Sequence, residues 1–337
     1  MNATPHIAIA GATGAVGEEM LQCLAERDFP LRKLTLLASA RSAGKTLSFR
    51  GESIEIQELT RKSFSEVDIA LFSAGGEISR EFAPAAAEAG AVVIDNSSAF
   101  RMQEDVPLVI PEVNPEDALQ HPRGLIANPN CTTIVTLMAL APLHRAFGVK
   151  QVIASSYQAV SGSGAKGIAE LESQIVALAQ NQAIVPSVYP RQIVSNVIPL
   201  VESLTENGYT KEEMKMQNEG RKILHHSLFR ASVTCVRVPV HRSHAISVTA
   251  DFKRPVTVEG AREALRAAKG IEVVDDREKA LFPTPLDTTG RDACQVGRIR
   301  SDLVFENGLS LWVVGDQVRK GAALNAVQIA ELLLPEG

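Results

Sequence analysis

The sequence predicts an α/β fold: an N-terminal doubly wound parallel sheet, then an α+β domain with a mixed sheet, and a C-terminal helix that packs back on the first domain. Three observations support this prediction. Short β-type runs alternate with helical runs over roughly the first 130 residues. Longer β-type runs follow, with irregular stretches between them. The segment 321–334, GAALNAVQIAELLL, is strongly apolar and helical in pattern.

The first half begins with the β run HIAIA at 6–10, which leads into GATGAVG and then into the helical run EEMLQCLAERDFP, ended by Pro30. A helix is also expected through SREFAPAAAEAG. The other β runs of this half lie at 33–39, 67–75 and 91–96. Strands that alternate with helices in this way indicate a Rossmann-like parallel sheet.

A new pattern starts near residue 130 with the helical run TTIVTLMALAPLHRAFG, for which Gly148 is a stop signal. The β runs of this half lie at 150–160, 230–240 and 244–252. We therefore expect a nucleotide-binding domain over 1–129, completed by 316–337, and a catalytic and dimerisation domain over 130–315.

Composition excludes several classes of protein. The 337 residues carry a formal net charge of −5 without a long basic run, so a nucleic acid is not an expected partner. No charged leader with a long apolar core begins the chain, and no stretch reaches about 18 uninterrupted apolar residues. The four cysteines are widely spaced and contain no CxxC pair. We expect a cytoplasmic protein with no membrane contact, no disulfide framework and no metal site.

The glycine pattern between the first β run and the first helix indicates nucleotide binding. Gly11, Gly14 and Gly17 are spaced GxxGxxG, one residue different from the commoner GxGxxG. Glycines at this point let a backbone approach a pyrophosphate, and the helix N-terminus supplies amide donors. A structural tight turn is the alternative interpretation.

The end of the second β run indicates which dinucleotide binds. An NAD site usually carries an acidic residue here for the ribose hydroxyls, but the sequence reads ASARSAGK. Arg41 and Ser42 offer a cation and a hydroxyl for a 2′-phosphate, which favours NADP over NAD. Arg41 could otherwise be a solvated loop arginine.

Cys131, in ANPNCTTI, lies where the apolar helix of the second half begins. If Asn128 caps this helix and Pro129 is its first residue, Cys131 takes about the third position. The helix dipole would then lower the pKa of the thiol and favour the nucleophilic thiolate. Position alone does not separate a nucleophile from a buried packing residue.

Several motifs together resemble the aspartate-β-semialdehyde dehydrogenase family, in order along nearly the whole chain. They are GATGAVG, LASARSAGK, VIDNSSAFRM, VIPEVNP, NPNCTTI, SYQAVSGSGAKG, GYTKEEMKMQNEGRKIL, RVPVHRSHA and GDQVRKGAALNAVQIAE. The resemblance implies NADPH-dependent conversion of aspartyl phosphate to aspartate semialdehyde, which feeds lysine, methionine and threonine synthesis. It also implies a homodimer or homotetramer, with the sheet of the second domain at the interface.

The resemblance also assigns roles to individual residues. It makes Cys131 the acyl-carrying nucleophile, Gln158 a neighbour that positions the substrate, and His244 the acid/base. Arg237 would grip the substrate carboxylate, and Glu212 would meet its ammonium group. The remaining implied contacts are Arg101 and Lys215 for phosphate, and Gly11, Thr13, Gly14, Ala15, Val16, Arg41, Ser42, Ser161, Gly162 and Gln317 for NADP.

Each of these residue types also has an ordinary structural interpretation. Arg237 alternates with valines on a β run, which is typical of an arginine on a solvent face. Glu212 and Lys215, three residues apart on a helix, are typical of an exposed ion pair. Arg101 follows a strand end, where surface exposure is usual, and Gln158 with Ser161 could belong to a turn rich in Ser and Gly.

Two positions depart from the family pattern. Relatives often have Gly-His-Ser at the histidine, whereas this chain has His241-Arg242-Ser243-His244, so His241 competes with His244. A strand would place residues 241 and 244 on opposite faces, because their separation is odd. Gln317 stands where relatives often have Asn, which keeps the amide but lengthens it by a methylene.

Two other functions compete with this interpretation. N-acetyl-γ-glutamyl-phosphate reductase uses the same thioester logic, but its cysteine motif typically reads NPGCY and it needs no acidic residue for an ammonium group. A non-catalytic NADP-binding relative would leave the set Cys131, Gln158, Arg237 and His244 unexplained.

Overall fold

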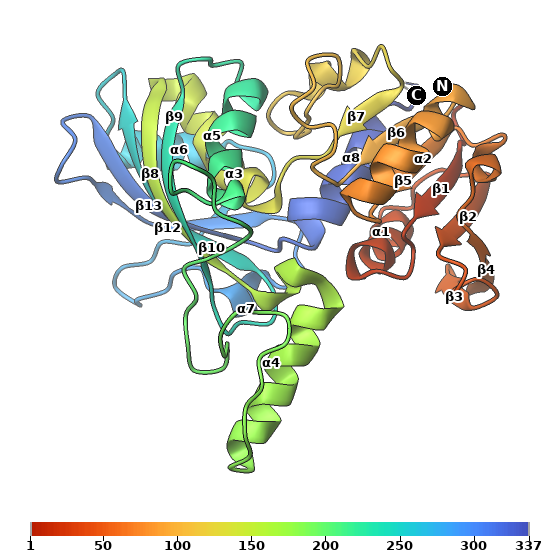
Figure 1. Cartoon of the computed structure of the whole chain (residues 1–337). Helices are drawn as coiled ribbons and strands as arrows, with labels where there is room; N and C mark the ends of the chain where they lie inside the picture. The colour runs from red at the N-terminus through yellow and green to blue at the C-terminus, as the bar shows by residue number, and fades with distance from the viewer. Residues whose placement is uncertain (1, 336–337) are drawn as a thin grey trace. The chain divides into compact units, whose positions relative to one another are not determined.

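The computed structural model describes residues 2–335, so the outermost residues of the expected domain bounds lie outside it. The chain divides into two compact units. The first unit comprises the chain up to Asn130 together with the segment from Ala322 onward, and the second unit runs from Cys131 to Gly321. The two units are drawn in Figure 1 with their helices and strands labelled.

The first unit contains a seven-stranded sheet in the order β3-β4-β2-β1-β5-β6-β7. The pairs from β4 through β7 are parallel, and only the edge pair β3–β4 is antiparallel. The strands are β1 (His6–Ala10), β2 (Lys33–Ala38), β3 (Thr46–Phe49), β4 (Glu52–Glu58), β5 (Ile69–Phe72), β6 (Val92–Asp95) and β7 (Leu125–Ala127). The helices are α1 (Ala15–Glu26), η1 (Arg61–Phe64), α2 (Gly76–Glu88), η2 (Pro115–Leu119) and α8 (Leu324–Leu332).

Strand β1 is the centre of this sheet, and all five of its residues are buried. It pairs with β2 on one side and with β5 on the other, so the strand order reverses at β1. In doubly wound sheets, ligands bind beyond the carboxyl ends of the strands at such a reversal. The predicted fold class is confirmed, although the β3–β4 hairpin was not anticipated.

The C-terminal helix α8 packs into the core of the first unit. Its residues Leu324, Val327 and Ile329 are buried in one cluster with Ile7 and Leu24. The amide nitrogen of Asn325 donates to the carbonyl of Val109 (3.0 Å) and to the side chain of Asn128 (2.6 Å). The predicted return of the C-terminal helix to the first domain is confirmed.

The second unit contains a six-stranded mixed sheet in the order β11-β12-β13-β10-β8-β9. Its strands are β8 (Val149–Gln158), β9 (Arg230–Arg237), β10 (His244–Phe252), β11 (Ile271–Val273), β12 (Cys294–Ser301) and β13 (Gly308–Gly315). Its helical segments are α3 (Cys131–Phe147), η3 (Val160–Ser163), α4 (Gly164–Ala179), α5 (Lys211–Ile223), α6 (Val258–Arg266), α7 (Pro285–Thr288) and η4 (Arg319–Ala323), the last leading into α8. Strands β8 and β9 are parallel, and β10 runs antiparallel to β8 and to β13.

The registers of this sheet place polar residues side by side at one end of it. Gln158 at the end of β8 is paired with Arg237 at the end of β9. Strand β10 runs the other way, so its first residue, His244, lies at the same end. The predicted run 230–240 stops at Arg237, since Pro239 cannot donate to a ladder.

Helix α3 begins later than predicted. Asn128 is not its cap, because the Asn128 amide donates to Asn96 (2.6 Å) and accepts from Asn325 (2.6 Å). The helix starts at Cys131, which makes this residue its first rather than its third. It ends at Phe147, before Gly148, which has a positive φ of 73°, as the stop signal predicted.

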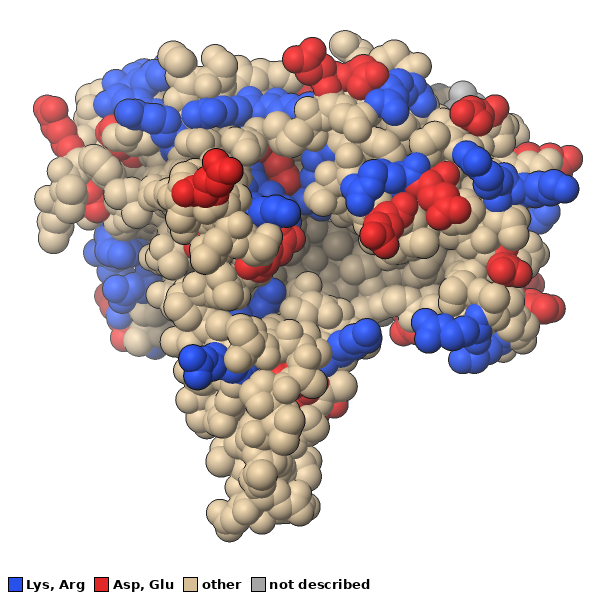
Figure 2. Space-filling view, viewed as in Figure 1, with Lys and Arg blue, Asp and Glu red and all other residues tan. Residues whose placement is uncertain are grey.

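Helix α4 and the loop after it project from the sheet of the second unit (Figure 1) and were not predicted. Charged side chains are sparse on their outer part in Figure 2, whereas basic and acidic side chains are intermixed elsewhere on the face shown. The exposed large apolar residues here are Ile175, Val176, Leu178, Val185 and Val188. None of the helices within the described part of the chain has the length and apolar character needed to span a membrane.

Candidate active site

The glycine loop after β1 lies at the strand-order reversal of the first unit. Gly11 has a φ of 91°, and a Cβ there would lie 3.0 Å from the backbone of Ser73 and Ala74. A Cβ on Gly17 would lie 2.3 Å from the Gly11 carbonyl oxygen, so this glycine lets α1 pack closely on the loop. Gly14 precedes α1, and no side chain caps the helix. The first amides of α1, at Ala15 and Val16, are therefore donors suited to a phosphate.

The turn after β2 carries Arg41 and Ser42 at the same edge of the sheet, because β2 runs parallel to β1. Arg41 is exposed and Ser42 is half-buried. The Ser42 amide donates to the carbonyl of Ser39 (2.8 Å), which fixes the turn. Thr13, in the glycine loop, is also exposed. The loops after β1 and β2 thus present backbone amides suited to a phosphate and an exposed cation on one unit.

Arg101 is buried, although its position after a strand end suggested a surface residue. Its side chain is buried in the first unit, with Nε donating to the Asn128 carbonyl (2.9 Å) and Nη2 to the Asn96 carbonyl (2.7 Å). Two backbone carbonyls therefore hold the guanidinium in place. A buried guanidinium fixed in this way is suited to an anion, because binding the anion would immobilise no further side-chain rotamers.

The other predicted residues gather at one end of the second unit's sheet. Gln158, Arg237 and His244 come from the ends of β8, β9 and β10, and all three are buried. Helix α5 supplies Glu212 and Lys215 beside them.

One hydrogen-bonded chain links the substrate residues predicted on β8 and α5. Ser156 Oγ donates to Gln158 Oε1 (3.0 Å), and Gln158 Nε2 donates to Glu212 Oε1 (3.0 Å). The ammonium of Lys215 donates to Glu212 Oε2 (2.9 Å) and to Glu202 Oε1 (2.6 Å). The predicted Glu212–Lys215 ion pair is present but is largely buried, not exposed.

Arg237 is 5% exposed, so the solvent-face interpretation of this residue is wrong. Its Nη1 donates to the carbonyl of Ala159 (2.7 Å), and its guanidinium carbon lies 5.8 Å from the centre of the Tyr189 ring. A Cβ on Gly162 would lie 2.7 Å from Nη1. The absence of a side chain at Gly162 therefore makes room for the guanidinium, whose other N–H groups remain suited to a carboxylate.

His244 is completely buried, and its hydrogen bonding defines its tautomer. The Ala159 amide donates to Nδ1 (3.1 Å), so the ring proton lies on Nε2. Nε2 has no hydrogen-bond partner among the described residues, and it lies on the side of Gly162, where a Cβ would be 3.3 Å away. Burial, and next the charge of Arg237, lower the pKa of His244 to about 3. The imidazole is therefore neutral at pH 7 and offers an N–H.

His241 and His244 were both candidates for the family's histidine, and a strand through both was expected to put them on opposite faces; that strand is not observed. Strand β10 begins at His244, and His241 lies in a bend before it. The His241 side chain is exposed, while its backbone carbonyl accepts from the Ser161 amide (3.1 Å). Only His244 joins the polar cluster at the strand ends.

Gln317 connects two segments of the site in the second unit. Its Nε2 donates to Ser161 Oγ, and its Oε1 accepts from the Ser243 amide (2.8 Å). These bonds hold η3 and the start of β10 together. Contact of Ser161, Gly162 and Gln317 with a nicotinamide stays a prediction.

Cys131 lies in the first turn of α3, where amide groups have no partner within the helix. Gly321 packs against it, and a Cβ at Gly321 would lie 3.0 Å from the Cβ of Cys131. Cys235 has a different environment, since its side chain is 2% exposed and burial raises the pKa of its thiol. Cys131 thus lies at the amino-terminal end of a helix, whereas Cys235 is a buried packing residue.

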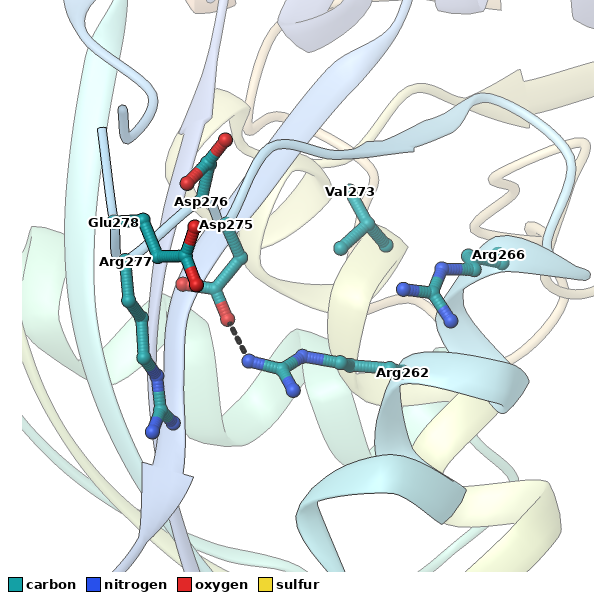
Figure 3. A pocket seen from close by; sticks show the side chains of 7 residues that line it. All are labelled: Arg262, Arg266, Val273, Asp275, Asp276, Arg277 and Glu278. Atoms are coloured by element: carbon teal, nitrogen blue, oxygen red, sulfur yellow. Dashed lines mark hydrogen bonds and ion pairs between the residues drawn. The ribbon is translucent and has the colours of Figure 1, made fainter. Parts of the chain in front are cut away.

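A hollow of about 530 Å³ lies elsewhere in the second unit, against α6 and the segment after β11 (Figure 3). None of the predicted site residues lines it. Several of its charged groups are paired: Arg262 donates to Asp275 (2.7 Å), and Arg266 donates to Glu259 (3.1 Å). We regard this hollow as a surface feature.

Four residues of the cluster were missed from the sequence: Ser156, Tyr189, Glu202 and Gly321. Ser156 lies two residues before Gln158 on the same face of β8, which the period of a strand could have revealed. Tyr189 and Glu202 lie in irregular segments distant in the sequence, and Gly321 lies in the helical segment η4. No local pattern marks them.

The fold and site define a class: a nucleotide-binding sheet joined to a domain that carries a helix-terminal cysteine, an imidazole and a buried arginine. Two family models match the chain, the semialdehyde dehydrogenase NAD-binding domain over residues 6–121 and the semialdehyde dehydrogenase dimerisation domain over residues 140–320.

Individual relatives agree with the family models. The aspartate-semialdehyde dehydrogenase of Aquifex aeolicus is 50% identical over 98% of both chains. The crystal structure of aspartate-semialdehyde dehydrogenase II from Vibrio cholerae, complexed with ASA, is 48% identical with a TM-score of 0.96, over 98% of both chains. That of the Candida albicans enzyme with NADP is 25% identical with a TM-score of 0.77, also over 98% of both. The chain belongs to the aspartate-semialdehyde dehydrogenase family, which confirms the resemblance found in its motifs.

Proposed function

We propose that this oxidoreductase catalyses the NADP-dependent reductive dephosphorylation of L-aspartyl 4-phosphate to L-aspartate 4-semialdehyde through a cysteine thioester. The observation that carries the proposal is the cluster of Gln158, Arg237 and His244 at the strand ends of the second unit, in a chain of this family. We assign it to the synthesis of lysine, methionine and threonine.

In this mechanism Cys131 is the nucleophile. Its thiolate attacks the acyl carbon of the aspartyl phosphate, the C–O bond to phosphate breaks, and a thioester forms. NADPH, when bound, would supply the hydride that reduces the thioester carbon and leaves an anionic thiohemiacetal on Cys131. Collapse of this intermediate breaks the C–S bond, which releases the aldehyde and restores the thiolate.

His244 stabilises the oxygen that becomes anionic in both tetrahedral intermediates. The Ala159 amide occupies Nδ1, so the neutral ring presents its Nε2–H as a hydrogen-bond donor. The proton shuttling expected from the sequence requires either the imidazolium or loss of the Ala159 bond. A substrate carboxylate on Arg237 would offset the charge that lowers the pKa of His244, which moves this pKa upward in the complex.

The substrate has three charged groups, and the assigned residues match each of them. Arg237 binds the α-carboxylate, because a guanidinium can donate two parallel hydrogen bonds to it. Glu212 binds the α-ammonium group, and Gln158, held by Ser156 and Glu212, positions the substrate. We assign phosphate binding to Arg101 and Lys215, because each carries a cation in a buried or half-buried setting.

NADP is the proposed cofactor. Its pyrophosphate would bind at Gly11, Thr13, Gly14, Ala15 and Val16, and its 2′-phosphate at Arg41 and Ser42. The absence of a side-chain cap on α1 and the exposed cation after β2 support this assignment, as does the bound NADP of the Candida albicans relative. We assign Ser161, Gly162 and Gln317 to the nicotinamide end.

The working form is proposed to be a cytoplasmic homodimer or homotetramer. The match of residues 140–320 to a dimerisation domain supports self-association. One face of the six-stranded sheet carries the exposed apolar side chains of Ile153 and Tyr157, which is typical of an interface. Acyl phosphate and NADPH are intracellular metabolites, which supports the compartment.

One assay tests the proposed function in the reverse direction. Purified protein is given aspartate semialdehyde, inorganic phosphate and either NADP or NAD, and the reduced nicotinamide is followed by its absorbance. We expect phosphate-dependent reduction that is faster with NADP. Activity with N-acetyl-glutamate semialdehyde instead would favour N-acetyl-γ-glutamyl-phosphate reductase, and dinucleotide binding without turnover would favour a non-catalytic relative.

A further inference from the structure

The ammonium group of Lys215 lies between two carboxylates. Glu212 belongs to the same helix and approaches to 2.9 Å, whereas Glu202 precedes the helix and approaches more closely, to 2.6 Å. Burial alone lowers the pKa of Lys215, but the charges of Glu212 and Glu202 outweigh it and raise this pKa above the usual value. Lys215 is therefore a cation whose charge is already compensated within the second unit.

The backbone around Glu202 holds its carboxylate beside the Lys215 ammonium group. Glu202 has a φ of 64°, a left-handed conformation that is uncommon for a residue other than glycine. The turn that follows is closed by a bridge between Leu204 and Thr210 and by hydrogen bonds of Thr205 to Tyr209 (2.7 Å). Non-glycine residues in this conformation gather at functional sites, where the surrounding structure fixes them.

The hydrogen bonds of Lys215 limit what an anion can gain from it. An ammonium group has three N–H donors, and the two glutamates take two of them. An incoming phosphate finds one donor left among the described contacts, and it also meets the repulsion of Glu202. To use a second donor, it must displace the Glu202 carboxylate, whose side chain is 43% exposed and can move into solvent.

We propose that Glu202 competes with phosphate for Lys215 and thereby sets the phosphate affinity of the active site. The proposal rests on the assigned role of Lys215 as a phosphate ligand. In the biosynthetic direction phosphate is the leaving group, and the Glu202 carboxylate replaces it on the ammonium as it departs. Glu202 acts through Lys215 and is a positioning residue.

The test compares Glu202→Gln with Glu206→Gln in the full-length protein. Both substitutions remove one negative charge from the same turn, but Glu206 is exposed and has no part in the Lys215 pair. The probes are inorganic phosphate as substrate in the reverse reaction and sulfate as its competitor. We expect Glu202→Gln to lower the KM for phosphate and the inhibition constant of sulfate about two- to fivefold, the range for partly exposed ion pairs.

The KM for aspartate semialdehyde should stay unchanged in Glu202→Gln, and Glu206→Gln should match the unsubstituted protein throughout. A gain in anion affinity is an outcome that loss of a merely structural contact does not produce. An unchanged or raised KM for phosphate in Glu202→Gln overturns the proposal.

A Lys215→Met variant separates this inference from the function on which it rests. If Lys215→Met leaves the KM for phosphate unchanged, the phosphate role of Lys215 itself is wrong. If it raises that KM while Glu202→Gln has no effect, only the inference fails. In the double variant Glu202→Gln should have no further effect on the KM for phosphate, because Glu202 competes with phosphate only for Lys215.

Discussion

The glycine loop after β1 and the polar cluster at the ends of β8, β9 and β10 are built by different means. The loop presents backbone amides, and its shape depends on the lack of side chains at Gly11 and Gly17, while the neighbouring turn after β2 adds the exposed cation Arg41. The cluster presents buried side chains, each held by a partner from a distant segment. A flexible pyrophosphate can bind to a loop of backbone amides. Bond making at one carbon needs side chains that are held in fixed positions.

If this division is correct, substitutions in the cluster change the chemistry and leave dinucleotide binding intact, and substitutions at the loop do the reverse. The predictions below test the division, beginning with the largest expected effect.

Cys131→Ala should abolish phosphate-dependent reduction of NADP by aspartate semialdehyde, with a loss of about 10⁴-fold or more, because no other described thiol replaces the nucleophile. Stopped-flow and steady-state absorbance of reduced nicotinamide measure this loss. NADP binding, measured by calorimetry, should be close to that of the unsubstituted protein. Retained turnover would refute the nucleophile assignment.

His244→Ala should lower kcat about 10²- to 10³-fold, the usual cost of removing an oxyanion donor, and His241→Ala should have little effect. The pH profile sharpens this test. A donor with a low pKa gives a kcat profile without an ionisation near pH 6.5, whereas a proton shuttle gives one. A greater loss for His241→Ala than for His244→Ala in single-turnover hydride transfer would overturn the choice of imidazole.

Arg237→Ala should raise the KM for aspartate semialdehyde, with a loss in kcat/KM equivalent to about 2 to 5 kcal/mol, because a buried charge-assisted pair is removed. The KM for phosphate, measured in the same assay, should change little. A variant in which only the phosphate KM rises would show that the two cationic roles are exchanged.

Arg41→Ala belongs to the other region and should weaken NADP binding about tenfold while leaving NAD binding unchanged, since only NADP has the 2′-phosphate. Calorimetric titration with both dinucleotides gives the ratio. Saturating NADP should restore kcat, and a kcat that stays low would contradict the division between the two regions.

Acid stability is the fifth test, and its effect is spread over several pH units. The ordinary pKa of histidine is 6.5, and that of buried His244 is about 3, so the unfolded chain binds more protons between these pH values. The stabilisation is complete above pH 6.5 and is lost as the pH falls toward 3, by at most about 1.4 kcal/mol per pH unit. The free energy of unfolding of His244→Asn, measured by thermal unfolding, should depend less steeply on pH over about pH 4.5–6.5 than that of the unsubstituted protein. Equal slopes would contradict a buried neutral imidazole.

Local patterns predicted much of the fold. The alternation of β and helical runs predicted the doubly wound sheet and its strands β1, β2, β5 and β6, but not β3, β4 and β7. Gly11 to Gly17 marked its loop because glycine spacing is a local signal. The burial of Arg101 and Arg237 could not be predicted, because their partners, the carbonyls of Asn128 and Ala159, become neighbours only in the folded chain. The helix start predicted from Asn128 was wrong for the same reason. Asn325, nearly 200 residues away in the sequence, donates to the side-chain oxygen of Asn128.

Helix α8 fills the core of a sheet whose first strand begins at residue 6. During synthesis on the ribosome, the apolar side chains of Ile7 and Leu24 therefore cannot be covered by α8 until the last segment of the chain has been made. The intervening second unit can fold first. Nascent chains shortened before residue 324 should consequently be held by chaperones and degraded sooner than full-length ones.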